Sequence, residues 1–261
     1  MKEFTIKPNQ YKKLVSIIMP TRNRMIPTFH NDGFAQEGGL IPSLESIYNT
    51  TEHKDKIEII LRVDNDDHNT LDNLHLLDKY DKVFDMKLLK GDRYGGYVDL
   101  WRMWNELATA AEGEFILPFS DDVTMKTVGW EGIMESNSGK VSIVKSTFLD
   151  GVNGFSGEGF TTEDFLAIPF IHSKIIELQG YMEFHASTDT KWTVWNNIAK
   201  TKGYNFEIIE PNIQLSHKCM GGEHVRDELP PTRPDGITAH YNIIEDDVQR
   251  VINGLEVAQL K

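Results

Sequence analysis

The chain has 261 residues, a net charge of −13 and 39% hydrophobic residues. Its 13 Phe, 8 Tyr and 5 Trp supply ample material for a packed core, which excludes a wholly disordered chain. The acidic balance also excludes a protein that binds nucleic acid or anionic membranes through its overall charge.

Cysteine usage and the apolar runs bear on the compartment. The single cysteine, Cys219, excludes an internal disulfide and fits a reducing compartment. Residues 1–7 lack the apolar core of a signal peptide. No apolar run approaches the roughly 20 residues of a membrane span. We therefore expect a soluble cytoplasmic protein with no membrane span and no nucleic-acid partner.

Strand-like and helix-like stretches alternate through the first half of the chain. Strands are predicted at 14–20, 57–63, 83–89 and 114–119, with helices between them at 40–50, 69–80 and 97–112. Alternation of this kind favours an α/β fold with a mostly parallel sheet and crossover helices. The nearly continuous apolar character of the first two strands agrees, because parallel strands are covered on both faces.

The second half is less regular. Strands are predicted at 141–148, 166–171 and 206–215, and helices at 173–179, 189–202 and 242–258. Gly-rich and Pro-rich composition predicts loops at 150–162 and 218–238. Tryptophans at helical spacing are more often core than ligand platforms, so we expect core positions for at least three of Trp101, Trp104, Trp192 and Trp195. Trp130, which follows Gly129, is the candidate for a sugar-stacking platform.

The apolar strand at 114–119 runs directly into two adjacent acids, Asp121 and Asp122. Paired carboxylates at the rim of a sheet can hold Mg²⁺ or Mn²⁺, and such ions commonly carry phosphates. Adjacent acids recur elsewhere in this acidic chain, where most are solvated surface. The position of this pair distinguishes it, because ligands of open α/β sheets bind beyond the carboxyl ends of strands.

Two further candidate sites follow the first and second strands. In the stretch 20–24, Arg22 and Arg24 offer forked donors for a pyrophosphate or a base carbonyl, and the alternative is a solvated loop. Asp64 can accept from a nucleobase N–H or a ribose hydroxyl, and the alternative is a turn, which the stretch 64–67 also suits. All three candidate sites lie at the carboxyl ends of strands in one predicted sheet.

These stretches resemble the GT-A glycosyltransferases, specifically those of the large family 2 type. The matching residues are 15–24, 59–66, Gly95, Gly96, Asn105 and the run from 111 to 122. The resemblance covers residues 14–123 in the right order and weakens beyond them. It implies one GT-A domain over 1–261, with a nucleotide-sugar-binding half at 1–123, an acceptor half at 124–240 and a C-terminal helix at 241–261.

The resemblance also implies a nucleotide-diphospho-sugar donor and a divalent metal, Mn²⁺ or Mg²⁺. By position, Asp122 would be the direct metal ligand. The implied donor-binding residues are Pro20, Thr21, Arg22, Arg24, Asp64 and Asp121. This chain departs from the family after the second strand, where two acids followed by Gly-Ser are common and 64–68 reads Asp-Asn-Asp-Asp-His, so the base preference stays open.

Family 2 enzymes carry a catalytic base just before a helix, after a Gly-aromatic turn. Asp189 fits that order, because it follows Gly180-Tyr181 and precedes a predicted helix. The alternative is that Asp189 only caps the helix, and Glu183 and His185 are competing bases.

A late histidine often completes the metal shell in GT-A enzymes, and His217 is the candidate here. The loop 218–238 would then be a lid that closes over the donor, or else a plain surface connection.

The function expected from this resemblance is a metal-dependent, inverting transfer of a hexosyl unit to a hydroxyl of a glycan, lipid or protein. One alternative is a sugar-nucleotide nucleotidyltransferase, which usually has a Gly-rich basic loop after its first strand. This chain has no glycine there before Gly33. The other alternative is a non-catalytic carbohydrate-binding module that keeps the fold.

Overall fold

A computed structural model describes residues 1–7, 10–22, 25, 39–96, 99–121, 123–149, 166, 168–184, 188–217 and 240–259. For Phe148, residues 188–190 and His217 it describes the backbone alone. The predicted loops at 150–162 and 218–238, together with Arg24, Asp122 and His185, lie outside the described residues.

The first half of the chain alternates strands and helices as predicted. Its elements are β1 (Lys13–Thr21), α1 (Leu40–Thr50), η1 (Lys54–Lys56), β2 (Ile57–Asp64), α2 (His68–Leu71), η2 (Leu74–Leu77), α3 (Asp78–Asp81), β3 (Asp85–Gly91), α4 (Leu100–Ala110) and β4 (Gly113–Pro118).

The second half mixes short strands with longer helices. Its elements are β5 (Val123–Met125), α5 (Trp130–Ser136), β6 (Ile143–Phe148), β7 (Phe170–His172), α6 (Ser173–Gln179), α7 (Thr188–Thr201), β8 (Glu207–His217) and α8 (Tyr241–Gln259).

Within the described ranges, one eight-stranded sheet joins both halves, in the order β3-β2-β1-β4-β7-β6-β8-β5. Strands β1 to β4 are mutually parallel where they pair, as are β6 and β8. The antiparallel strand β7 connects the two parallel groups, and β5 adds an antiparallel edge. The α/β fold with a mostly parallel central sheet is therefore confirmed.

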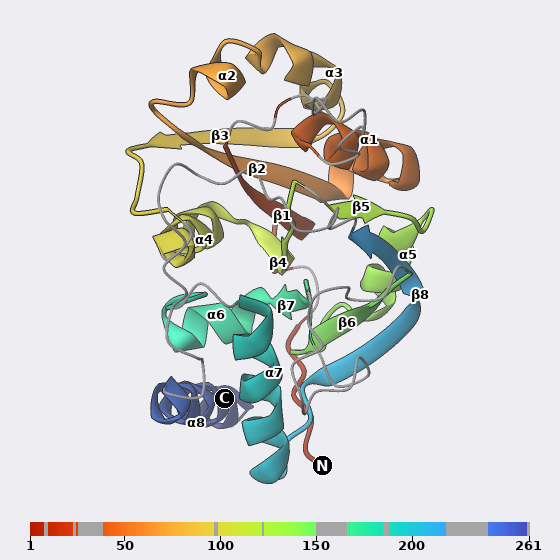
Figure 1. The fold of residues 1–261 in the computed structure, drawn as a ribbon. Coiled ribbons are helices and arrows are strands. Elements are labelled where there is room, and N and C mark those ends of the chain that lie inside the picture. The colour runs from red at the N-terminus through yellow and green to blue at the C-terminus, as the bar shows by residue number, and fades with distance from the viewer. Residues whose placement is uncertain are drawn as a thin grey trace.

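Two apolar cores lie on opposite faces of the sheet, because successive residues of a strand point to opposite sides. Along β1, Ile18 belongs to one core and its neighbours Ile17 and Met19 to the other. The first core packs β1, β2 and β4 against α4, α6, α7 and α8. The second lies under α1, α3 and α5 (Figure 1).

The predicted helix at 69–80 is wrong as a single element, because the segment divides into α2, η2 and α3. The Asp67 carboxylate caps α2 by accepting from the Thr70 N–H (3.1 Å). The helix ends at Leu71, and Asn73 precedes the start of η2. The predicted strand at 166–171 shortens to β7. No helix among the described residues is long and apolar enough to cross a membrane.

Trp130 is not a sugar-stacking platform, so that prediction was wrong. Its side chain is fully buried, packs against Phe170 and donates its indole N–H to Oγ1 of Thr51 (3.1 Å). Trp104, Trp192 and Trp195 are buried, as predicted for core tryptophans at helical spacing.

Candidate active site

The carboxyl ends of β1, β2 and β4 meet at one edge of the sheet, because these strands are parallel neighbours. Thr21 at the end of β1 is the register partner of Val63, next to the last residue of β2. Beyond β4, the Phe119 N–H donates to the Ile18 carbonyl (2.9 Å), which keeps the following segment beside β1. We call the residues gathered here, Thr21, Arg22, Asp64, Asp66 and Asp121, the donor rim.

Asp121 is fixed to the end of β1. Oγ1 of Thr21 donates to Oδ2 of Asp121 (3.0 Å), and both side chains are almost fully buried. The Asp121 carbonyl accepts from the Gly39 N–H (2.7 Å), which brings the start of α1 to the same place. Two of the predicted donor-binding residues, which lie far apart in the sequence, are thus in direct contact.

Arg22 and Asp64 form a second contact across the rim. Nη1 of Arg22 donates to Oδ2 of Asp64 (2.9 Å) and to Oδ1 of Asp66 (2.7 Å). The hydrogen bond that Arg22 donates to Asp66 raises the pKa of Arg22 against a smaller effect of burial, and Asp64 adds to the rise. The same contact lowers the pKa of the exposed Asp66 carboxyl. Arg22 therefore stays a cation. The Asp64 carboxylate beside it is buried, with 1% exposed.

Arg62 was not predicted as a site residue, yet it donates to the Asp64 carboxylate from inside the protein. It is fully buried, and its Nη1 donates to Oδ1 of Asp64 (3.0 Å). Its Nε donates to Oε2 of Glu106 on α4 (2.6 Å), and its Nη2 to the Asp92 carbonyl (2.8 Å). Burial lowers the pKa of Arg62, but the hydrogen bond and charge of Glu106 and the charge of Asp64 outweigh burial and raise it.

A signal for Arg62 was present in the sequence. An arginine within the otherwise apolar run 57–63 must find carboxylate partners if the strand is buried on both faces. The site also depends on Gly91, where a Cβ atom would lie 2.5 Å from Nη2 of Arg62. A side chain at position 91 would therefore displace the guanidinium from its present place.

The remaining predicted residues of the donor and metal site are described in part. Pro20 in β1 is the register partner of Arg62. His217 ends β8, and its backbone pairs with Val123, the residue that follows Asp122 in the sequence. Among the residues with described side chains, no group of three His, Cys, Asp or Glu could hold a metal. Asp122 and the His217 side chain are not among them.

Asp189, the predicted base, lies in the first turn of α7, which begins at Thr188, so its backbone is inside the helix rather than just before it. Its competitor Glu183 is 1% exposed, and its Oε1 accepts from the Trp192 indole N–H (2.6 Å). A carboxylate held this way inside the protein is poorly placed to receive a proton from an acceptor. Burial therefore argues against Glu183 as the base.

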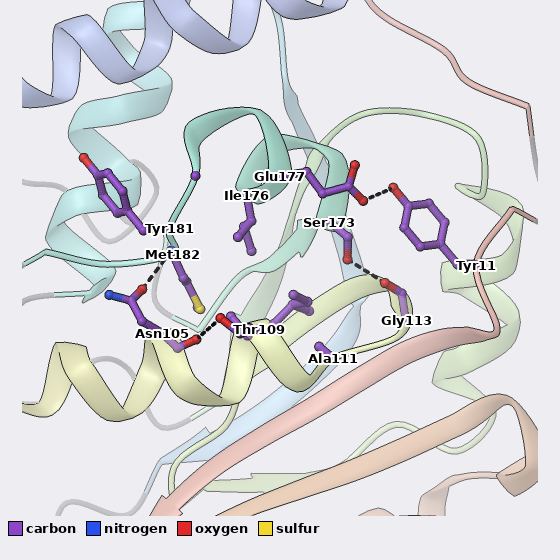
Figure 2. Close-up of a pocket in the computed structure, with 13 residues that line it drawn as sticks. Tyr11, Asn105, Thr109, Ala111, Gly113, Ser173, Ile176, Glu177, Tyr181 and Met182 are labelled. Atoms are coloured by element: carbon purple, nitrogen blue, oxygen red, sulfur yellow. Dashed lines mark hydrogen bonds between the residues drawn. The ribbon is translucent and has the colours of Figure 1, made fainter.

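A cavity of about 270 Å³ lies away from the donor rim, at the amino end of β4 (Figure 2). Its walls come from α4, α6 and the turn that follows α6, and include Asn105, Ile176 and Met182. Tyr11 and Glu177 meet at one side of it, where the tyrosine hydroxyl donates to the carboxylate (3.1 Å). Because Gly113 at the start of β4 lines it, this cavity lies at the opposite end of that strand from the rim residues.

No model of a known protein family matches the sequence, and no curated protein sequence matches it. Solved structures do match the fold. One is the mannosyltransferase PcManGT from Pyrobaculum calidifontis in complex with GDP-Man and Mn²⁺, at a TM-score of 0.59 and 14% identity. That match covers 98% of this chain and 79% of the mannosyltransferase chain.

Structures of S. aureus TarS match as well. The complex of TarS 1–349 with UDP-GlcNAc has a TM-score of 0.58 at 17% identity, over 91% of this chain and 72% of that chain. The complex with UDP has a TM-score of 0.54 at 17% identity, over 78% of this chain. This chain spans 60% of that TarS chain and 36% of a longer TarS structure. These neighbours show that the chain has the GT-A glycosyltransferase fold.

Proposed function

We propose that this protein is a glycosyltransferase that moves a sugar from a nucleotide-diphosphate donor to a hydroxyl acceptor. The observation that carries the proposal is the donor rim, where Thr21 contacts Asp121 and Arg22 contacts Asp64 at one sheet edge. Ligands of open α/β sheets bind beyond the carboxyl ends of the strands, which is the edge where these residues lie. The donor half would be residues 1–123 of a single domain, and the acceptor half 124–240.

Within this proposal, Asp64 binds the nucleoside. Its carboxylate is held between Arg22 and Arg62, so its oxygens have fixed directions before a ligand arrives. An ionised carboxylate accepts hydrogen bonds only, which suits a base N–H or a ribose hydroxyl. Arg24 would add a cation near the diphosphate.

A divalent cation fits the chemistry of this rim. The arginines Arg22 and Arg62 already engage the carboxylates of Asp64, Asp66 and Glu106, which neutralise much of their charge. The diphosphate therefore needs another positive group. Carboxylate and imidazole ligands from Asp122 and His217 suit Mn²⁺ or Mg²⁺, which would supply charge to the leaving diphosphate when bound.

The proposed transfer is a single displacement with inversion. Asp189 takes the proton from the acceptor hydroxyl as its oxygen forms a bond to the anomeric carbon. The bond between that carbon and the diphosphate oxygen breaks, and the diphosphate leaves with the bonding electrons. A hexosyl donor and an acceptor on a glycan, lipid or protein complete the proposal.

Calorimetry with UDP and GDP, each with and without Mn²⁺, tests the donor site. We expect metal-dependent binding of at least one nucleotide, lost in Asp122→Ala and kept in Asp78→Ala, an acidic control on α3. Failure of both nucleotides to bind the wild-type protein would contradict the proposal. Unchanged glycan binding by Asp122→Ala, with no donor turnover by the wild type, would favour the non-catalytic module instead.

The assignment of Asp189 has its own test. Asp189→Asn should lower the transfer rate by roughly 10²–10⁴-fold, because a general base contributes about that much. Nucleotide affinity should not change, because the donor half is untouched. A variant that transfers sugar at the wild-type rate would reduce Asp189 to a helix cap.

A further inference from the structure

Neighbouring residues of α4 reach two different parts of the molecule. Glu106 accepts from Arg62, which in turn donates to Asp64 of the donor rim. Asn105, the residue before it, faces the turn formed by residues 181–184, which precedes α7 (Figure 2). Helix α4 thus contacts both Arg62, which supports the Asp64 carboxylate, and the turn that precedes the helix with the predicted base.

The Asn105 amide is matched to the turn backbone. Its Oδ1 accepts from the N–H groups of Met182 (2.9 Å) and Glu183 (2.8 Å). Its Nδ2 donates to the Glu183 carbonyl (2.7 Å). A carboxylate could accept the first two bonds but has no proton for the third, and an apolar side chain could make none. The three bonds therefore specify asparagine.

Helix α7 holds the same turn from the other side. Nζ of Lys191 donates to the Met182 carbonyl (2.6 Å), and Nε1 of Trp192 donates to the Glu183 carboxylate (2.6 Å). Both residues lie in α7 shortly after Asp189, and both are fully buried. Because a helix is rigid over one or two turns, fixing these two side chains also fixes the backbone of the first turn.

The cavity beside the turn makes these bonds more important. It borders Asn105 and the turn residues Tyr181 and Met182, so part of that side of the turn is not filled by packing, although Met182 itself belongs to the apolar core. The hydrogen bonds from Asn105 therefore add to apolar packing in fixing the backbone position. The amide of Asn105 connects α4 to the turn, and the neighbouring Glu106 connects α4 to Arg62 and so to the rim.

We propose that Asn105 is a positioning residue for sugar transfer, which holds α7 and the predicted base Asp189 in register with the donor rim. The role rests on the proposed function. In this proposal two adjacent residues have different tasks. Glu106 supports nucleotide binding through Arg62, and Asn105 sets the geometry of the transfer step. Small displacements of a reacting group are costly in rate, whereas they leave binding of the remote nucleotide unchanged.

The test compares Asn105→Ala and Asn105→Asp with Thr109→Ala. Thr109 lies one turn further along α4, lines the same cavity and is exposed, so its loss controls for a change in the helix surface. We expect kcat to fall roughly 10- to 100-fold in Asn105→Ala, with the nucleotide Kd within about twofold of wild type. Asn105→Asp should lie between, because it keeps an oxygen that accepts from the N–H groups of Met182 and Glu183. Thr109→Ala should match wild type.

Amide hydrogen exchange gives a second readout that needs no turnover. Asn105→Ala should speed exchange in residues 182–184 and 188–192 and leave β1 and β2 unchanged. A kcat equal to that of Thr109→Ala, a nucleotide affinity that falls as much as kcat, or faster exchange spread over the whole chain would each overturn the positioning role. If wild-type protein itself binds no nucleotide and transfers no sugar, the proposed function fails first, and this role with it.

Discussion

The donor rim and the turn at 181–184 are held together by different kinds of bond. At the rim, charged side chains pair with one another, as Arg22 and Arg62 do with Asp64. At the turn, side chains bind the backbone, as Asn105 and Lys191 do with Met182. A charged ligand can exchange partners with paired side chains, but it cannot replace bonds that define the course of the chain.

The two regions also differ in what burial does to their ionisable groups. Burial opposes the charge of Arg62, but nearby carboxylates keep that guanidinium ionised. At the turn, burial lowers the pKa of Lys191 to about 8, against the smaller opposing effects of Glu183 and Asp247. Burial likewise raises the pKa of Asp247, although Tyr181 donates to it (2.5 Å). Nearby carboxylates thus outweigh burial at Arg62 in the rim, whereas burial near the turn weakens the charged forms of Lys191 and Asp247.

Arg62→Met tests the rim and should have the largest effect on stability. The variant leaves the buried Asp64 carboxylate without one of its two cations, and loss of one partner from a buried pair costs about 3–5 kcal/mol. Urea unfolding would measure the loss, and nucleotide affinity should fall as well. Arg102→Met is the control, because Arg102 is 48% exposed and its pair with Asp99 contributes little. Equal stability of the two variants would show that Arg62 does not hold the rim.

Lys191→Met tests the region around the turn through the pH dependence of the unfolding free energy. Burial lowers the pKa of Lys191 from 10.5 to about 8, so between these values the unfolded chain binds more protons than the folded one. Stability contributed by this group therefore rises with pH across that window, by about 3 kcal/mol in all. The variant lacks the titrating amine, so its unfolding free energy relative to wild type should fall between about pH 8 and pH 10.5. A pH-independent difference between the two proteins would contradict the expected burial of a charged amine.

Local sequence patterns predicted the elements that carry their own signal. The helix predicted at 173–179 matches α6 residue for residue, and the apolar runs at 14–20 and 57–63 became β1 and β2. Short elements fixed by distant partners were missed. The three-residue β5 exists because it pairs with β8, and α5 starts after Gly129, whose φ is 70°.

The candidate site shows the same division. The order of motifs predicted that Thr21, Arg22, Asp64 and Asp121 belong together, because parallel strands bring their ends to one edge. It did not predict that Arg62 would find Glu106, or that Asn105 would hold the backbone at Met182. Such pairs depend on how α4 packs over the sheet, which side-chain spacing within one element does not encode.

Thr21→Val should have the smallest effect of the three, and it separates stability from ligand binding within the rim. The variant removes the bond from Thr21 to Asp121 (3.0 Å), whose net contribution to unfolding free energy is about 1 kcal/mol. Asp121 then loses one donor to its carboxylate, so Mn²⁺-dependent nucleotide binding should weaken more than stability does. Thr21→Ser keeps the hydroxyl and should bind nucleotide nearly as wild type does. If Val and Ser behave alike in calorimetry, the contact between β1 and Asp121 serves the fold alone, and the rim's organisation for a ligand rests on Arg22 and Asp64.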